Sequence, residues 1–482
     1  MNKFNVRVSG VLIPVATMII LLYSCQQNQE IMKPPVARKI AKELSIHDDT
    51  RIDNYYWMKD RENPEVLEYL KAENAYTDAM LKHTAQFQDK LYNEIVGRIK
   101  QTDMSVPYKL NGYFYYSRYE EGQEYPVYCR KKENLEASEE IMLNANEMAK
   151  GHDFFNLSGL NVSPDNKMIS YGVDTVSRRK FTLHVKNLKT GEILQEAIPN
   201  TTGYAAWAND NQTLFYTIKN EMTLRPEKVY RHQLGGDMNQ DELLYYEDDE
   251  TFSTSAYNSK SKELIIIGSY STLSTEYRFI HADKPLEEFK IVQPRQKDLE
   301  YFLAHYKDKF YIRTNYEAKN FRLMEVLIDS PGIDNWKEVI PHRPDILFED
   351  FEIFKNFLVL DERIKGLSNI RVIDWGGKNE YYVDFGESAY MAYLSKNPEF
   401  DTEVLRYGFT SMITPNSIYD YNMVSKEKEL LKIQEVVGGY NREDYQSERF
   451  NVLASDGKEI PLSIVYKKGL VKDADNPLLI YG

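Results

Sequence analysis

The chain has 482 residues, of which 42% are hydrophobic and 28% charged, so it is a globular protein of two or three domains rather than a disordered polypeptide. Its formal net charge of −14 argues against a nucleic-acid partner, because binding to phosphates needs clustered Lys and Arg. The 37 tyrosines favour β structure, since tyrosine suits half-buried strand surfaces.

The start of the chain has the pattern of a bacterial lipoprotein signal peptide. Lys3 and Arg7 precede an apolar stretch over residues 11–22, which is shorter than the roughly 20 residues that a membrane span needs. The stretch ends in "LYSC", which resembles the lipobox. We therefore predict a signal peptide over residues 1–25, with Cys25 as the lipidated residue. The alternative is an ordinary signal peptide with an incidental cysteine.

This prediction sets the expected location and the cysteine chemistry. Acyl chains on Cys25 would anchor the protein to a membrane of the bacterial cell envelope, facing the periplasm. Cys129, the second of two cysteines, would then have no partner for an intrachain disulfide. The sequence contains no CxxC or HExxH motif, so no metal site or cofactor is predicted.

Residues 26–105 are predicted to form a polar tether and a helical segment. Asn63-Pro64-Glu65 has the pattern of a helix start: a capping residue, a proline in the first turn and an acidic residue. Apolar residues then recur at helical spacing in two stretches, beginning at Val66 and Phe87. We interpret both stripes as packing surfaces.

Period-two alternation replaces the helical period after Pro107 and indicates strands. A repeated unit of about four short strands recurs at roughly 45 to 55 residues. The expected centres of its second strands are Tyr115, Ile169, Leu214, Ile265, Tyr311, Leu358 and Tyr407. Seven such units over residues 106–444 predict a mainly β fold, a seven-bladed β-propeller.

Polar motifs within the repeats have structural explanations. Residues 163–166 and 209–211 are predicted to be turns before second strands, without a ligand role. Trp207 is predicted to pack within a blade. His184 and His232 lie in predicted strands, where we expect surface histidines or histidines with satisfied hydrogen bonds.

Residues 445–482 have a sequence pattern that differs from those of the helical segment and of the repeats. Alternating apolar residues on both sides of Ser455-Asp456-Gly457 predict a hairpin. The continuous apolar run Leu478–Tyr481 is typical of a strand buried on both faces, as in the parallel sheet of an α/β domain. Such a strand is not stable as an open edge. These residues therefore predict the beginning of a truncated α/β domain.

No catalytic apparatus is recognisable in the chain. The serine of a nucleophile elbow lies in a Gly-x-Ser-x-Gly motif, and none is present. The nearest matches, at residues 386–390 and 366–370, have the wrong fifth residue. The histidines are scattered singly, and no phosphate-binding loop appears. We assign no catalytic residue to this chain.

Several long segments resemble the prolyl oligopeptidase family and, within it, the oligopeptidase B (protease II) branch. They include "RIDNYYWMKDRENPEVLEYLKAENAYTDAML" from Arg51, "EGQEYPVYCRKK" from Glu121, "SPDNKMISYGVDTVSRR" from Ser163, "RYGFTSMITPNSIYDYNM" from Arg406 and "YQSERFNVLASDGKEIPLSIVYKK" from Tyr445. The resemblance is ordered along nearly the whole chain from about residue 34, and it covers the N-terminal portion of the family.

The resemblance implies a seven-bladed propeller that caps an α/β-hydrolase domain and limits access to short peptide substrates. The family hydrolyses peptides with a Ser-Asp-His triad and an oxyanion hole. Oligopeptidase B members cleave after Arg or Lys. In the family the triad lies beyond the segment that matches Gly482. The resemblance matches Tyr481 to the first tyrosine of a "YGYG" pattern, in which the second tyrosine, directly after the glycine, is the oxyanion donor. Residues 445–482 would then be the first strands of the hydrolase domain, and this chain would be inactive by itself.

A hypothesis of a different class remains. The chain could be a non-catalytic propeller lipoprotein that binds peptides or a protein partner. That hypothesis predicts a stable, monodisperse product of 482 residues, which an unpaired apolar strand at Leu478–Tyr481 opposes.

Overall fold

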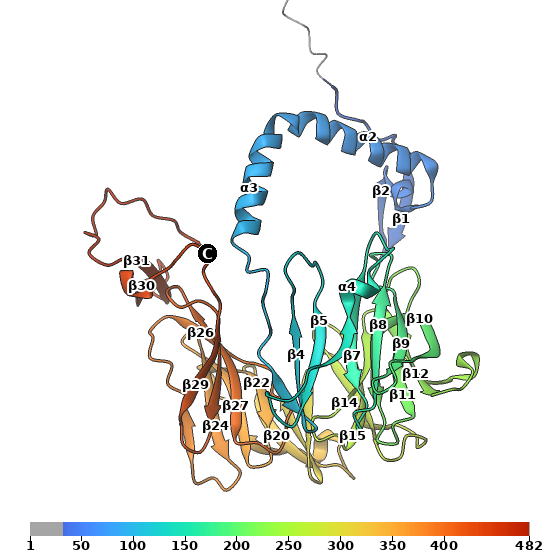
Figure 1. Cartoon of the computed structure of the whole chain (residues 1–482), viewed down its shortest axis with the longest axis vertical. Helices are drawn as coiled ribbons and strands as arrows, with labels where there is room; N and C mark the ends of the chain where they lie inside the picture. The colour runs from blue at the N-terminus through green and yellow to red at the C-terminus, as the bar shows by residue number, and fades with distance from the viewer. Residues whose placement is uncertain (1–31, 482) are drawn as a thin grey trace, which may run out of the picture. The chain divides into compact units, whose positions relative to one another are not determined.

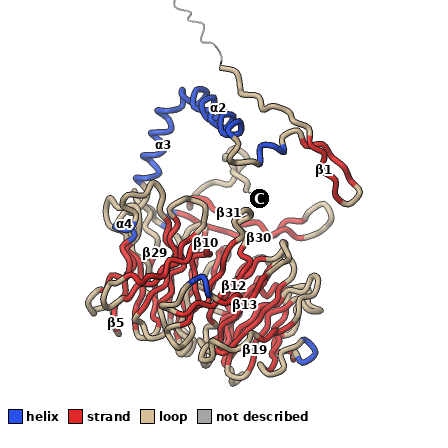
Figure 2. Tube along the Cα trace, turned by 90° about the vertical axis from the view of Figure 1, so that its right-hand side faces the viewer, coloured by secondary structure: helices blue, strands red, loops and turns tan. Residues whose placement is uncertain are grey.

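The computed structural model describes residues 32–481, which divide into two compact units, before and after the boundary between Ile99 and Lys100. Cys25 lies outside the described residues. Strands dominate the larger unit, whereas the two long helices belong to the smaller one (Figure 2).

The smaller unit contains a hairpin and two helices. Its elements are β1 (Lys42–Ile46), β2 (Asp49–Asp53), η1 (Tyr56–Lys59), α2 (Pro64–Leu81), η2 (Lys82–Thr84) and α3 (Ala85–Gly97). Asn63 caps α2 by accepting a hydrogen bond of 3.0 Å from the Glu65 backbone N–H, and Pro64 occupies the first helical position, so the predicted helix start is confirmed. None of the helices within residues 32–481 is long and apolar enough to cross a membrane.

The packing predicted for the helical stripes is not made by the described residues. Val66 is buried, but Leu70 on α2 and Phe87, Leu91 and Ile95 on α3 are exposed. The reason is that a stripe on one helix is buried only when another apolar surface lies against it.

The larger unit contains six antiparallel sheets of the propeller (Figure 1). Five of them have four strands, and one has seven. Sheet 1 comprises β3 (Tyr108–Leu110), β4 (Tyr113–Arg118), β5 (Val127–Lys132) and β6 (Glu140–Asn144), followed by α4 (Ala145–Met148). Sheet 2 comprises β7 (Asn156–Val162), β8 (Met168–Asp174), β9 (Phe181–Asn187), β10 (Ile193–Trp207), β11 (Thr213–Lys219), β12 (Pro226–Gln233) and β13 (Glu242–Tyr246), with η3 (Met238–Gln240) before β13.

The remaining four-stranded sheets follow in chain order. Sheet 3 comprises β14 (Ser253–Asn258), β15 (Leu264–Tyr270), β16 (Thr275–His281) and β17 (Lys290–Gln293). Sheet 4 comprises β18 (Tyr301–Tyr306), β19 (Lys309–Thr314), β20 (Arg322–Leu327), η4 (Ile333–Asn335) and β21 (Lys337–Ile340). Sheet 5 comprises β22 (Ile346–Ile353), β23 (Phe357–Ile364), β24 (Leu367–Asp374) and β25 (Glu380–Tyr382), and sheet 6 comprises β26 (Tyr390–Leu394), β27 (Val404–Ser411), β28 (Ser417–Asn422) and β29 (Lys428–Ile433).

The prediction of seven separate four-stranded blades is wrong: there are five, and the second and third repeats share sheet 2. The cause is β10, which pairs with β9 from Ile193 to Thr201 and with β11 from Thr201 to Trp207. One unbroken strand thus joins two repeats. The predicted second-strand centres are nevertheless confirmed as strand residues, since they lie in β4, β8, β11, β15, β19, β23 and β27.

Glycines allow β10 to pass close to its neighbours. A Cβ atom on Gly159 of β7 would lie 2.0 Å from the Gly203 carbonyl oxygen, and one on Gly172 of β8 would lie 2.3 Å from the Gly203 Cα atom. Gly203 itself has a φ of +91°, which other residues rarely adopt. The backbones approach this closely because none of the three residues carries a side chain.

Apolar clusters join each sheet to the next. Examples are Tyr115 with Ile169 between sheets 1 and 2, and Phe279 with Phe310 between sheets 3 and 4. Similar clusters lie between sheets 2 and 3, 4 and 5, and 5 and 6. Sheet 6 meets sheet 1 through polar contacts, in which Arg406 donates to the Pro107 carbonyl oxygen at 2.7 Å. The sheets therefore form a closed ring.

The last described residues follow the ring. After η5 (Arg442–Asp444), strands β30 (Tyr445–Leu453) and β31 (Glu459–Lys467) form the predicted hairpin. The predicted strand Leu478–Tyr481 is not formed: these residues have no regular structure, and Leu479 is 92% and Tyr481 99% exposed. A strand needs a neighbouring backbone for its hydrogen bonds, and none of residues 32–481 supplies one here.

Candidate functional site

A cavity with a volume of about 630 Å³ lies between sheets 1 and 6 of the ring. Its walls are mainly apolar and aromatic, with a few charged groups, which is the usual composition of a ligand site. The aromatic lining consists of Tyr108, Tyr115, Tyr116 and Tyr128, and the charged lining of Asp103, Lys396, Arg406 and Lys432.

Ion pairs hold three of the charged groups of this cavity in place, namely Asp103, Arg406 and Lys432. Lys432 lies 2.7 Å from both carboxylate oxygens of Asp103 and donates to the Met104 carbonyl oxygen at 2.6 Å. Burial raises the pKa of Asp103, but the bonds from Lys432 outweigh it and leave this pKa below its usual value. Arg406 forms two bonds, of 2.7 and 2.8 Å, with Asp420. These charged side chains are thus paired with one another and are not positioned to act on a reacting group.

The tyrosines of the cavity are hydrogen-bonding groups rather than bases. Burial raises the pKa of Tyr108 and of Tyr115 to about 12, so both hydroxyls stay protonated at neutral pH. Tyr115 donates to the side-chain oxygen of Asn166 at 3.1 Å. The cavity can therefore hold a ligand by stacking and hydrogen bonding, but it offers no activated nucleophile.

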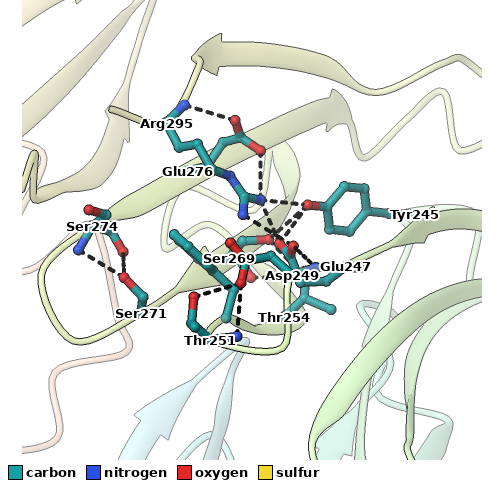
Figure 3. A network of polar contacts seen from close by, with 12 residues as sticks. Tyr245, Glu247, Asp249, Thr251, Thr254, Ser269, Ser271, Ser274, Glu276 and Arg295 are labelled. Atoms are coloured by element: carbon teal, nitrogen blue, oxygen red, sulfur yellow. Dashed lines mark hydrogen bonds and ion pairs between the residues drawn. The ribbon is translucent and has the colours of Figure 1, made fainter. Parts of the chain in front are cut away.

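A second group of polar residues joins sheets 2 and 3 (Figure 3). Its centre is Glu247, whose side chain is 1% exposed. Arg295 donates to its two carboxylate oxygens at 2.5 and 3.1 Å, and the Tyr245 hydroxyl donates at 2.7 Å. Arg295 also contacts Glu276 at 3.3 Å. Burial acts to raise the pKa of Glu247, yet its hydrogen bonds with Arg295 and Tyr245 lower it overall.

This network fixes the segment between β13 and β14. Arg225 donates to the carbonyl oxygens of Glu247 and Phe252, at 3.1 and 2.7 Å. Arg295 also lies over the ring of Phe252, 4.0 Å from its centre. A cavity of about 380 Å³ adjoins the network and is lined by Phe252, Arg295 and the loop 271–274. The arrangement makes a rigid wall for that cavity.

The serines closest to a nucleophile elbow in sequence are not in catalytic surroundings. Ser388 is exposed between β25 and β26, and the buried Ser368 hydroxyl accepts a hydrogen bond of 2.8 Å from the Ala392 backbone N–H. Residues 32–481 contain no grouping of three or more His, Cys, Asp or Glu side chains that could hold a metal ion.

The two histidines singled out in the sequence differ from each other. His184 on β9 is half-buried and packs against Tyr171, and burial lowers its pKa. His232 on β12 is fully buried, and its Nδ1 lies 2.8 Å from an oxygen of Asp241. Its Nε2 has no hydrogen-bond partner among the described residues, so the prediction of a satisfied or surface histidine is wrong for this atom. The tertiary fold buries it between strands.

The turns and Trp207 lie where the sequence places them. Residues 163–166 connect β7 to β8, and residues 209–211 connect β10 to β11. The two turns touch, because the Asp165 backbone N–H donates to the side-chain oxygen of Asn211 at 2.8 Å. Trp207 is 1% exposed and donates from Nε1 to the Asn161 carbonyl oxygen at 3.0 Å, so its packing role is confirmed.

Sequence reasoning missed the ion pairs that shape both cavities. Asp103 and Lys432 are 329 positions apart, and Glu247 and Arg295 are 48 apart. Spacings of this size carry no periodic signal, since the contacts depend on how the sheets are arranged around the ring.

A sequence model described as "Prolyl oligopeptidase, N-terminal beta-propeller domain" matches residues 34–434. The chain belongs to the prolyl oligopeptidase family. It is 40% identical to the dipeptidyl aminopeptidase BI of Pseudoxanthomonas mexicana, over 93% of this chain and 64% of that protein. It is 29% identical to protease 2 of Moraxella lacunata, over 94% of this chain and 66% of that protein.

Solved structures of this family share the fold. Oligopeptidase B from Leishmania major matches with a TM-score of 0.84 and 29% identity, over 92% of this chain and 66% of that structure. Oligopeptidase B from Trypanosoma brucei, with covalently bound antipain, matches with a TM-score of 0.82 and 26% identity, over the same shares. The chain spans about two thirds of the length of these prolyl oligopeptidase family members.

Proposed function

We propose that this chain is the N-terminal part of a serine oligopeptidase similar to oligopeptidase B, which hydrolyses short peptides after Arg or Lys. In this proposal the Ser-Asp-His triad lies in a hydrolase domain that follows Gly482, and the 482-residue chain is inactive. Family membership supports the peptidase class, and the share of about two thirds leaves room for a further domain.

The observation that carries the proposal is exposed apolar surface on segments that need a cover. Leu478–Tyr481 form an apolar run with no strand partner among the described residues, and Phe87, Leu91 and Ile95 on α3 are exposed as well. Large exposed apolar groups in a soluble protein usually mark a surface that another domain or chain covers. A hydrolase sheet starting at β30 and β31 would use Leu478–Tyr481 as one of its strands.

The ring would act as a size filter in this enzyme. The ring is held closed by five apolar clusters and the polar contacts between sheets 6 and 1, which would oppose its opening for a folded protein. Short, flexible peptides could reach a triad that the propeller covers. Charge stabilisation in such a covered site is strong, because water is excluded.

We further propose that Cys25 carries the lipid that holds the enzyme in the bacterial envelope, facing the periplasm. The support is the sequence pattern of residues 1–25 alone. Metabolic labelling with a fatty-acid analogue checks this directly: label is expected on the wild-type chain and not on Cys25→Ala. Equal labelling of both would contradict the anchor.

Hydrolysis assays test the enzymatic proposal. The 482-residue chain and a chain extended along the downstream reading frame are compared on an arginyl-coumarin substrate with a blocked N-terminus. We expect turnover that a serine-directed inhibitor abolishes, and only from the extended chain. Serine-dependent turnover by the 482-residue chain would overturn the proposal, as would a reading frame that stops after Gly482.

The names of the relatives define the competing substrates. A blocked prolyl substrate and an unblocked dipeptidyl substrate serve as comparisons, because a prolyl endopeptidase and a dipeptidyl aminopeptidase are among the similar proteins. The highest kcat/KM is expected for the blocked arginyl substrate. A higher kcat/KM on either comparison substrate would keep the peptidase class and reject cleavage after Arg or Lys.

A further inference from the structure

A cavity of about 390 Å³ lies where the turns of sheets that are not neighbours meet. It is lined by the β3–β4 turn at Asn111, the β14–β15 turn at Ser259, Lys260 and Lys262, and the segment after β26 at Lys396. These elements belong to sheets 1, 3 and 6, and β7 and β10 of sheet 2 complete the wall. Because sheets 1 and 3 are separated by sheet 2, the cavity lies on the axis of the ring.

The charge of this cavity is opposite to that of the chain. Three lysines line it, Lys260, Lys262 and Lys396, and none of its lining residues within the described chain is acidic. The whole chain carries 74 acidic and 60 basic residues. A cationic pocket in an acidic protein concentrates anions locally, because its walls focus the field of the lysines.

Lys260 is the one lysine of the three with a carboxylate partner. Its Nζ lies 2.6 Å from an oxygen of Glu352 on sheet 5 and 3.8 Å from the centre of the Phe354 ring. Burial lowers the pKa of Lys260 and raises that of Glu352, and the attraction between the two groups opposes both shifts. The charge of Lys260 is therefore neutralised by Glu352, and this ion pair holds one wall of the cavity in place.

Lys262 and Lys396 lack such a partner. Lys262 donates to the neutral side-chain oxygen of Asn111, across the ring in sheet 1. Lys396 lies 3.7 Å from the centre of the Tyr108 ring. Neither forms an ion pair with a carboxylate among residues 32–481, although Glu399 is close enough to act on Lys262 through its charge.

The ammonium groups of Lys262 and Lys396 lose part of their hydration in these surroundings. Burial lowers the pKa of Lys262, which is half-buried, and also that of Lys396, which keeps part of its side chain exposed to solvent. An anion between them would restore that lost stabilisation. The backbone is already in place for it, since the Asn209 side chain donates to the Lys262 carbonyl oxygen at 3.2 Å and Asn258 donates to that of Trp207 at 2.7 Å.

We propose that this axial cavity binds the carboxylate group of a short peptide through Lys262 and Lys396. The carboxylate is either the C-terminus of the peptide or an Asp or Glu side chain. A volume of about 390 Å³ falls within the range of about 300 to 1,000 Å³ of ligand pockets. The peptide as ligand rests on the proposed function, whereas the anion site rests on the lysines.

Binding of three acetylated tetrapeptides to the 482-residue chain tests the proposal by calorimetry. The first has a free C-terminal carboxylate, the second is its amide, and the third is an amide with one Glu side chain. We expect the first to bind at least about tenfold more tightly than the second, which is the usual value of one charge-assisted contact. The third peptide separates the two sources of the carboxylate. If its affinity equals that of the first peptide, the site binds any carboxylate. If its affinity equals that of the second peptide, the site binds the C-terminal carboxylate only.

Variants connect the binding to the two lysines. Lys262→Met and Lys396→Met are each expected to weaken carboxylate binding by about tenfold and to leave amide binding unchanged. Lys396→Arg keeps the charge and should keep the affinity. Lys189→Met, at an exposed lysine of the β9–β10 turn, is the matched control and should bind like the wild type. Circular dichroism of each variant verifies folding.

The pH profile gives an independent readout. Because the lysine pKa values are lowered, carboxylate affinity should decline at a lower pH than an ordinary lysine site would allow. Equal affinity for all three peptides would overturn the proposal, and so would unchanged binding in folded Lys262→Met and Lys396→Met. These measurements need no catalysis, so a failure of the hydrolysis assay and a failure of the carboxylate site are distinguishable.

Discussion

The guanidinium of Arg406 donates a hydrogen bond of 2.7 Å to the carbonyl oxygen of Pro107, a residue 299 positions earlier. The same guanidinium holds Asp420 on β28 with two further bonds. It therefore connects the last sheet of the ring to the first. Apolar clusters serve this purpose at the other junctions, so the closure of the ring depends on few polar contacts.

Arg406→Met tests the importance of this closure. The change leaves the Pro107 carbonyl oxygen and the Asp420 carboxylate without their partner, and we expect the free energy of unfolding to fall by about 2 to 4 kcal/mol. Urea unfolding measures the loss. Arg363→Met is the control, because the Arg363–Glu349 pair is more exposed, and it should cost below about 1 kcal/mol. Similar losses in the two variants would refute a special role for Arg406.

Gly172→Ala tests the close passage of β10 over β7 and β8. The new Cβ atom would lie 2.3 Å from the Gly203 Cα atom, so the backbones must separate. We expect a loss of about 3 kcal/mol in the free energy of unfolding. Gly332→Ala is the control, because its new Cβ atom would lie 3.9 Å from the nearest atom, the Gln293 side-chain oxygen. It should change the free energy of unfolding by less than about 0.5 kcal/mol. A stable Gly172→Ala protein would contradict the tight crossing.

Glu247→Gln tests the network between sheets 2 and 3. The amide cannot accept two charge-assisted bonds from Arg295, and the guanidinium keeps its contacts to the Tyr245 hydroxyl at 2.9 Å and to Glu276 at 3.3 Å. The expected loss is about 2 to 3 kcal/mol by urea unfolding. Glu287→Gln, which removes half of an exposed pair with Lys284, should cost far less. Equal effects would show that burial adds nothing to this network.

Asp361 on β23 makes stability depend on pH. Burial, followed by the charges of Glu349 and Asp350, raises its pKa from 3.8 to about 7. The folded state therefore binds an extra proton between these two values, and stability falls as pH rises through this window. Each unit of pKa difference is worth about 1.4 kcal/mol. Asp361→Asn should stabilise the protein more at pH 8 than at pH 5.

Thermal unfolding of wild type and Asp361→Asn at both pH values measures this difference. Glu349→Gln is the supporting variant, because removing one neighbouring charge should reduce the pH dependence without changing Asp361. A stability difference between Asp361→Asn and wild type that is the same at pH 5 and pH 8 would mean that Asp361 does not titrate in this range.

The strands of the ring could be predicted because their signal is local. Tyr115, Ile265 and Leu358 were all expected at the centres of second strands, and each lies in one. Alternation of apolar and polar residues reports directly on a strand with two different faces. The helix start at Asn63 was predictable for the same reason, since capping involves only neighbouring residues.

The joining of two repeats into the single sheet 2 could not be predicted from local sequence patterns. β10 continues through Gly203 because Gly159 and Gly172, far from it in sequence, leave room for its backbone. An isolated glycine within a strand pattern indicates a close approach, but it does not name the approaching segment. The separation of the sheets was therefore decided by packing.

The sequence by itself determined the family, the positions of the second strands and the helix start, because these depend on short-range patterns and on ordered motifs. Only the tertiary structure decided which charges meet. Asp103 meets Lys432 because the ring closes between sheets 6 and 1, and the Lys262 ammonium group meets the neutral Asn111 side chain because turns of distant sheets come together on the axis of the ring. It also decided the state of Leu478–Tyr481, whose apolar pattern suits a strand but whose backbone finds no partner among the described residues.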